Sequence, residues 1–231
     1  MIFTSTEHMG DFVLLWPIAS WYYKNKQEKI HFVITKNYHL CEKIVPLLEY
    51  QPFTEKVSLV DVSVGEHIFN PKKFDINGNY INFAHFRPAD GHLGKWMPYY
   101  HADPNNLGVD LDYKIIYPEM DVPKYDVVWI ETTPHRVLYN SLSKMVPTGS
   151  YELNHNDPII KNINLAMKAN EVWSTCAGFG VLMELVGKSQ TFVIGEKDPG
   201  IHNIRSNVYP DHPIQHKWIF VPMDICLRSI I

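Results

Sequence analysis

The stretch YPEMDVPK, residues 117–124, decides the fold of this chain because it separates two runs of alternating strand and helix signals. It holds two prolines in eight residues, which is typical of a connector, since proline lacks a backbone N–H and disrupts regular structure. The 231 residues are enough for one large domain or two small ones. The connector favours two, and we expect them over residues 1–120 and 121–231.

Before the connector, short β-rich runs alternate with runs that carry apolar residues at helical spacing. The predicted strands are residues 1–4, 30–35, 56–62, 79–86 and 111–117, and the predicted helices are residues 11–23 and 38–50. Pro17 is expected to kink the first helix unless its regular turns begin late. Strand, helix and strand in this order predict a parallel α/β sheet.

After the connector the same alternation restarts. The predicted strands are residues 125–130, 145–148, 171–175 and 191–195, and the predicted helices are residues 134–144, 157–169 and 179–186. Residues 212–231 form an aromatic and aliphatic tail that packs internally or makes a homodimer contact. The two halves therefore predict the fold class α/β, with two small doubly wound domains.

Composition and cysteine usage limit the class of protein. Lys and Arg number 21 against 25 Asp and Glu, so we expect no nucleic acid partner held mainly through its phosphates. The three scattered cysteines, Cys41, Cys176 and Cys226, indicate reduced thiols and a cytoplasmic protein. The longest apolar run, residues 12–23, contains Pro17 and is shorter than the roughly 20 residues of a membrane span, so no transmembrane segment is expected.

Polar residues follow the first predicted strand in TSTEHMGD, residues 4–11. Ligands bind at the carboxyl ends of parallel strands, where helices begin. Gly10 would let the backbone approach a ligand, and Asp11 is either a catalytic carboxylate or the N-cap of the helix. His8 and Glu7 are further candidates at the same strand end.

Two more strand ends carry suitable residues. In ETTPHR, residues 131–136, Thr132, Thr133 and Arg136 suit a phosphate, or Thr133 merely caps a helix that begins at Pro134. In STCAGFG, residues 174–180, the backbone N–H groups of a small-residue turn would meet a diphosphate. The predicted residues of this turn are Ala177, Gly178, Phe179 and Gly180. The turn matches neither the dinucleotide fingerprint nor the P-loop.

Two acidic residues near the third strand end are candidates for a ribose. Glu184 lies one to two turns into the predicted helix, where an ordinary surface glutamate is the alternative, and Glu196 belongs to the turn EKDPG. The middle of the chain, residues 87–104, predicts a long binding loop. His85, His92 and His101 there have spacings that match no zinc signature, so no metal site is expected.

Several blocks of the sequence resemble the lipopolysaccharide heptosyltransferases and their relatives. The blocks are MGDFVLLWPIASWYYKN, KIVPLLEYQPFTEKVSLVD, VVWIETTPHR, MVPTGS and EVWSTCAGFGVLMELVGKSQTFVIGEKDP. The chain departs from that family in lacking its histidine at the start of the late helix and its Lys-Trp-Pro after the ETTPHR turn, and in being shorter.

The resemblance implies a compact GT-B fold, with two Rossmann-like domains that face each other across a cleft. It implies a metal-independent, inverting glycosyltransferase without a cofactor, which uses a nucleotide sugar as donor and a glycan or another hydroxyl compound as acceptor. Asp11 would be the base, with His8 as the alternative, and residues 121–231 would hold the donor. The acceptor side would comprise Gly10, His85, Arg87, His92 and Trp96.

Two other functions fit the same sequence. One is a nucleotide-sugar epimerase or hydrolase on the same fold, which would act without an acceptor. The other is a non-catalytic protein that binds nucleotides or glycans and has lost turnover, which the departures from the family pattern would explain.

Overall fold

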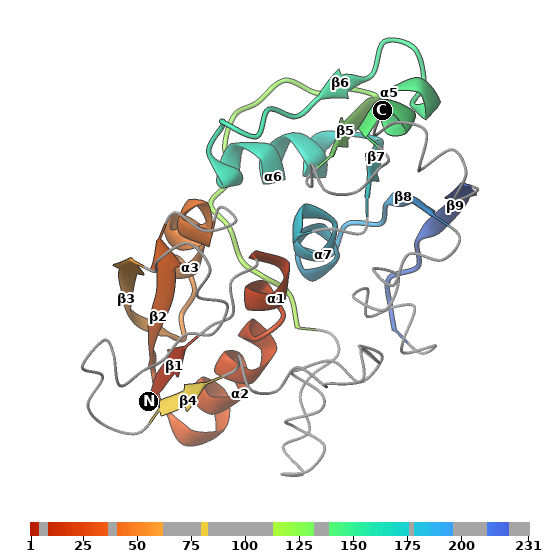
Figure 1. Cartoon of the computed structure of the whole chain (residues 1–231). Helices are drawn as coiled ribbons and strands as arrows, with labels where there is room; N and C mark the ends of the chain where they lie inside the picture. The colour runs from red at the N-terminus through yellow and green to blue at the C-terminus, as the bar shows by residue number, and fades with distance from the viewer. Residues whose placement is uncertain are drawn as a thin grey trace. The chain divides into compact units, whose positions relative to one another are not determined.

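The structure is a computed structural model that describes residues 1–4, 9–36, 41–61, 80–82, 113–131, 139–175, 178–195 and 212–221 (Figure 1). The chain divides into two compact units, Met1–Tyr117 and Pro118–Ile231. The division falls inside the proline-rich connector. The two units are described separately below.

The first unit contains a parallel sheet with the strand order β3-β2-β1-β4. Its strands are β1 (Ile2–Thr4), β2 (Ile30–Lys36), β3 (Thr54–Asp61) and β4 (Tyr80–Asn82). Phe3 in the central strand pairs with Phe32 on one side and Ile81 on the other. The predicted parallel α/β architecture is therefore confirmed in this unit.

The helices of the first unit show how proline shapes the chain. Helix α1 (Met9–Val13) ends before a turn, and α2 (Trp16–Lys26) then begins with Pro17 in its first turn. A proline costs nothing there, because the first N–H groups of a helix have no intrahelical acceptor. The predicted helix over residues 38–50 is the 3-10 turn η1 (Cys41–Ile44) followed by α3 (Val45–Glu49).

Aromatic rings fill the core of the first unit. The rings of Phe12 and Phe32 meet edge to face at 5.6 Å between centroids, and those of Trp16 and Phe53 do so at 6.2 Å. Phe3 contacts Phe32 in the same way at 5.8 Å. All five side chains are fully buried. Edge-to-face contacts of this kind add to the stabilisation that apolar burial gives.

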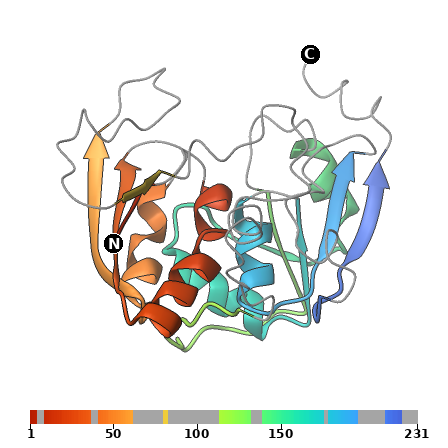
Figure 2. The same ribbon diagram turned by 90° about the horizontal axis from the view of Figure 1, so that it is seen from below.

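The second unit contains a parallel sheet with the strand order β6-β5-β7-β8-β9. Its strands are β5 (Val127–Ile130), β6 (Tyr151–Glu152), β7 (Glu171–Ser174), β8 (Thr191–Gly195) and β9 (Lys217–Val221). Figure 2 shows β8 and β9 side by side. The helices are α5 (Tyr139–Met145), α6 (Ile159–Lys168) and α7 (Gly178–Leu185). Trp129, Trp173 and Val193 form a core cluster with Leu142 of α5 on one face of the sheet.

Two predicted strands are wrong. Residues 113–117 form no strand, because the buried side chain of Gln51 takes the backbone groups of Ile116. Gln51 donates to the Ile116 carbonyl at 2.7 Å and accepts from its N–H at 3.3 Å. Residues 145–148 are the end of α5 and a turn, and the strand follows them as β6.

A second buried amide holds the start of the connector. Asn164 of α6 accepts from the Met120 N–H at 2.9 Å and donates to the Pro118 carbonyl at 3.0 Å. Gln51 therefore binds the residue directly before the connector within the first unit, and Asn164 binds the connector within the second. Side-chain amides replace a strand ladder over this extended segment.

Candidate functional site

The carboxyl ends of β5 and β7 carry two polar residues that the structure brings together. Glu131 directly follows β5, and Thr175 directly follows β7. The two strands are parallel neighbours, and Ile130 pairs with Ser174 at their ends. Continuing this register by one residue places Glu131 beside Thr175, on the sheet face that Trp129 and Trp173 share.

Both polar groups are buried and have no hydrogen-bond partner within the described part of the chain. Glu131 is 4% exposed and Thr175 is 1% exposed. The two carboxyl oxygens of Glu131 and the hydroxyl of Thr175 make no hydrogen bond to any described residue. Buried polar atoms are almost always hydrogen-bonded, because leaving one unsatisfied costs about 1–3 kcal/mol. Two such groups side by side at a strand end indicate a site that a ligand completes.

Burial and, to a lesser extent, the negative charge of Glu152 together raise the pKa of the Glu131 carboxyl from an ordinary 4.5 to about 7. The ionised form is disfavoured because no donor or cation among the described residues replaces the water that a carboxylate normally binds. Near neutral pH the group is therefore present in both protonation states. A carboxyl with such a perturbed pKa is typical of a functional site.

The N-terminus of α7 lies at the same end of the sheet. The helix begins at Gly178, three residues after Thr175. Its first turn presents N–H groups without intrahelical acceptors, and the helix dipole favours an anion there. The diphosphate site expected at Gly178, Phe179 and Gly180 stays a prediction, and these residues form the first turn of α7.

Gly180 allows α7 to pack closely on the sheet. A Cβ atom at this position would lie 2.6 Å from Cε1 of Phe192 and 2.8 Å from the Thr175 carbonyl oxygen. Neither distance is compatible with a side chain. The glycine therefore serves close helix–strand packing, which keeps the start of α7 beside the strand end that carries Thr175.

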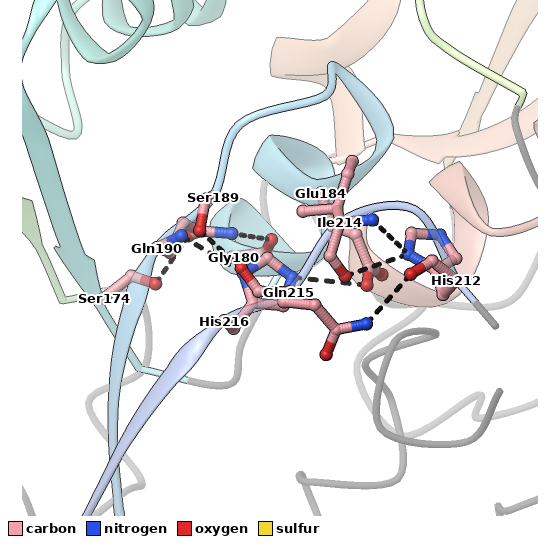
Figure 3. Close-up of polar contacts among 9 residues, drawn as sticks. All are labelled: Ser174, Gly180, Glu184, Ser189, Gln190, His212, Ile214, Gln215 and His216. Carbon is pink, nitrogen blue, oxygen red and sulfur yellow. Dashed lines mark hydrogen bonds and ion pairs between the residues drawn. The ribbon is translucent and has the colours of Figure 1, made fainter. Parts of the chain in front are cut away.

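A polar network joins α7 to β7 and β8 (Figure 3). The hydroxyl of Ser174 donates to Oε1 of Gln190 at 2.8 Å, and Nε2 of Gln190 donates to the Gly180 carbonyl at 2.8 Å. All of these contacts are buried. The network fixes the first turn of α7, and with it the candidate site.

His216 extends this network to the segment that leads into β9 (Figure 3). Its Nδ1 accepts from the Gln190 N–H at 3.1 Å, and its Nε2 lies 3.3 Å from Oε1 of Glu184. Since Nδ1 is an acceptor, the proton is on Nε2 and the neutral imidazole donates to Glu184. Both side chains are fully buried. The interpretation of Glu184 as an ordinary surface glutamate is wrong, because its side chain is buried beside His216. The ribose contact expected of Glu184 stays a prediction.

The structure places some of the predicted site residues and leaves others open. Gly10 and Asp11 lie inside α1, which begins at Met9, so the interpretation of Asp11 as an N-cap is wrong. The catalytic role of Asp11 stays a prediction. The following predicted residues lie outside the described residues: His8, His85, Arg87, His92, Trp96, Thr132, Thr133, Arg136, Ala177 and Glu196.

Sequence reasoning assigned no role to Glu131 or Thr175. A usable signal was present, since Glu131 directly follows the predicted strand over residues 125–130 and Thr175 ends the predicted strand over residues 171–175. Their pairing depends on β5 and β7 being neighbours, which the order of elements along the chain does not state.

The first unit also has a buried threonine at a strand end, and this one has a hydrogen-bond partner. Thr4, at the end of β1, is fully buried, and its hydroxyl donates to the Ile81 carbonyl at 3.3 Å. This threonine therefore has the hydrogen bond that Thr175 lacks.

Two searches of the described residues give negative results. No group of three or more His, Cys, Asp and Glu side chains there has a geometry that could hold a metal ion. None of the described helices combines the length and the apolar character that crossing a bilayer requires.

Comparison with known proteins identifies similar folds. No protein-family model and no curated protein sequence matches the chain. The crystal structure of a glycosyl transferase family 9 protein from Veillonella parvula DSM 2008 is similar with a TM-score of 0.58 at 14% identity, over 96% of this chain and 86% of that one. The iron-containing dodecameric glycosyltransferase TibC from enterotoxigenic E. coli H10407 gives 0.50 at 13% identity, over 83% and 57%. At these identities the likeness shows an α/β fold of the glycosyltransferase type.

Proposed function

We propose that this chain is a glycosyltransferase that moves a sugar from a nucleotide-sugar donor to a hydroxyl acceptor. One observation carries the proposal: unpartnered polar groups and a helix N-terminus gather at one strand end of a fold that resembles glycosyltransferase family 9. In open α/β sheets this end is where ligands bind. Fold likeness alone would not identify a function, because one fold supports many activities.

The donor would bind the second unit. Its diphosphate would lie at the start of α7, with hydrogen bonds from the hydroxyls of Thr132 and Thr133 and a bidentate contact from Arg136. Glu196 or Glu184 would bind the ribose. Backbone dipoles and a guanidinium would stabilise the negative charge of the leaving group without a metal ion.

The acceptor would bind residues of the first unit, in a GT-B arrangement of two Rossmann-like domains across a cleft. Asp11 would accept the proton of the acceptor hydroxyl, with His8 as the alternative base. The hydroxyl oxygen would then form a bond to the anomeric carbon while the bond from that carbon to the diphosphate breaks. The diphosphate would leave with the electron pair, and the configuration would invert.

Calorimetry with ADP, GDP, UDP and CDP tests the proposal most simply. We expect the chain to bind at least one of them, and binding of none would contradict a nucleotide-sugar enzyme. An assay of the corresponding nucleotide sugars with and without hydroxyl acceptors follows. Release of diphosphate without any acceptor would indicate a hydrolase, and binding without turnover would indicate a binding protein.

The role of Asp11 is tested by Asp11→Asn, with Asp121→Asn as the matched control at an exposed position of the connector. We expect a loss of turnover of at least a hundredfold for the first variant and none for the second, since general bases contribute about 10²–10⁴-fold. Unchanged turnover in a folded Asp11→Asn protein would exclude Asp11 as the base.

The cytoplasmic location and the homodimer stay predictions.

A further inference from the structure

The proposed donor contacts leave Glu131 and Thr175 unused, although these residues carry the unpartnered polar atoms at the strand ends. We propose that Glu131 and Thr175 form a subsite that binds a vicinal diol of the sugar-nucleotide donor. This inference rests on the proposed function and names a specific contact within it.

The side chains of Glu131 and Thr175 favour a ligand that donates hydrogen bonds. A carboxylate accepts through two oxygens and the threonine hydroxyl both donates and accepts, so a ligand that completes the site must bring O–H or N–H groups. A vicinal diol presents two neighbouring hydroxyls to the two oxygens of one carboxylate. It does so without adding charge to a buried site.

The same chemistry argues against a phosphate at this subsite. Glu131 is buried with Glu152 as its negative neighbour, and an anionic phosphate would add like charge to both. The diphosphate therefore belongs at the start of α7, where backbone N–H groups and the helix dipole favour an anion. This separates the charged part of the donor from its hydroxyl-bearing part.

The register of the sheet places the subsite next to the predicted phosphate turns. Glu131 immediately precedes Thr132 and Thr133, and Thr175 lies three residues before α7 begins. A donor whose diphosphate lies at these turns has its ribose on one side of the diphosphate and its transferred sugar on the other. Both sugars offer vicinal hydroxyls, so the two sources share the chemistry and the experiment must distinguish them.

The test is calorimetry on the whole chain and on Glu131→Gln, Glu131→Leu and Thr175→Val. The probes are ADP, GDP, UDP and CDP, their 2′,3′-dideoxy analogues, and ADP-glucose, GDP-mannose and UDP-glucose. Glu152→Gln is the control for charge, and Thr4→Val is the control for a buried threonine that already has a partner.

We expect Glu131→Gln and Thr175→Val each to weaken the binding of at least one probe about tenfold. Glu131→Leu should weaken the binding of that probe by at least the same factor. The two control variants should bind every probe as tightly as the natural chain does. If the loss occurs with the nucleoside diphosphate and not with its dideoxy analogue, the diol is that of the ribose. If the loss occurs only with the nucleotide sugar, the diol belongs to the transferred sugar.

Three results would overturn the inference. Unchanged binding in all three variants would remove the subsite and leave the proposed function intact. An equal loss for the natural and the dideoxy nucleotides, with no further loss for the nucleotide sugar, would show that the contact is not to a diol. Failure of the natural chain to bind any probe would instead refute the proposed function itself.

Discussion

The two parallel sheets end differently at their carboxyl edges. In the first unit the buried hydroxyl of Thr4 donates to the Ile81 carbonyl of the neighbouring strand. In the second unit the hydroxyl of Thr175 and the carboxyl of Glu131 are equally buried and have no partner among the described residues. The described threonine of the first edge has its hydrogen bond, whereas the described polar groups of the second edge lack hydrogen bonds that a ligand would supply.

The two units also differ in the contacts that hold their helices and strands together. The first unit relies on edge-to-face contacts among apolar aromatic rings, such as Phe12 and Phe32. The second unit holds α7 with a buried polar network that includes Gln190 and His216. Hydrogen bonds are directional, so they fix the orientation of a helix more closely than apolar contacts do. This network therefore holds the start of α7 near the strand end that carries Glu131 and Thr175.

The largest expected effect comes from breaking that network. His216→Leu leaves the Glu184 carboxylate without its imidazole partner and the Gln190 N–H without its acceptor. We expect the free energy of unfolding to fall by about 3 kcal/mol, as for other broken buried pairs. Urea denaturation measures it.

The matched control is His31→Leu in the first unit, where the imidazole contacts only the partly buried Ser58 hydroxyl among the contacts described. Its expected loss is about 1 kcal/mol or less. If both histidine variants lost the same free energy of unfolding, the second unit would not depend on its buried polar network more than the first unit depends on His31.

A smaller effect is expected from the close approach of α7 to its sheet. Gly180→Ala puts a Cβ atom 2.6 Å from the Phe192 ring, so we expect a loss of about 2 kcal/mol from overpacking. Gly149→Ala meets no atom within 4 Å but has a φ of +86°, and we expect about 1 kcal/mol from backbone strain. Thermal unfolding of both variants compares them, and a harmless Gly180→Ala would show that the packing yields easily.

The unpartnered carboxyl should make stability depend on pH. Because the pKa of Glu131 is about 7 in the folded chain and ordinary in the unfolded chain, the folded chain keeps a proton that the unfolded chain releases. Stability therefore falls as the pH rises from about 4.5 to 7.

Glu131→Gln removes this titration. Since one unit of pKa difference corresponds to about 1.36 kcal/mol, we expect the variant to gain up to about 3 kcal/mol of stability over the natural chain between pH 4 and pH 8. Glu152→Gln, which removes only the neighbouring charge, should give a smaller change. A pH-independent difference for Glu131→Gln would mean that Glu131 has a donor near its carboxylate.

The smallest expected effect compares the two threonines directly. Thr4→Val removes a satisfied hydrogen bond and should cost about 1 kcal/mol, whereas Thr175→Val removes an unsatisfied hydroxyl and should be neutral or slightly stabilising. Denaturant unfolding without ligand measures both. A larger loss for Thr175→Val would contradict the description of the second edge as unsatisfied.

Local signals predicted most of the regular elements. The strand over residues 191–195 matches β8, and the break of the first helix follows from Pro17. Long-range pairing explains the failures. Residues 113–117 carry a strand pattern, but the Gln51 side chain takes their backbone groups. Strand β9 was missed because its place depends on β8 as a neighbour.

The candidate site shows the same division between local and long-range information. The helix over residues 179–186 was predicted from its local pattern and matches α7, which begins one residue earlier and contains both Gly178 and Gly180. The juxtaposition of Glu131 and Thr175 depends on strand order and register, and the shifted pKa of Glu131 depends on burial. Neither property is written in a short stretch of sequence.

The most direct test of the central claim follows the backbone amide signals of the ¹⁵N-labelled chain by NMR during titration with ADP, GDP, UDP and CDP. The claim is that a nucleotide binds at the carboxyl edge of the second sheet and not at the edge that carries Thr4. We predict saturable shifts at Glu131, Thr175 and Gly178 with at least one nucleotide, and none at Thr4. Saturable shifts at Thr4 without shifts at those three residues, or no saturable shift anywhere, would contradict the claim.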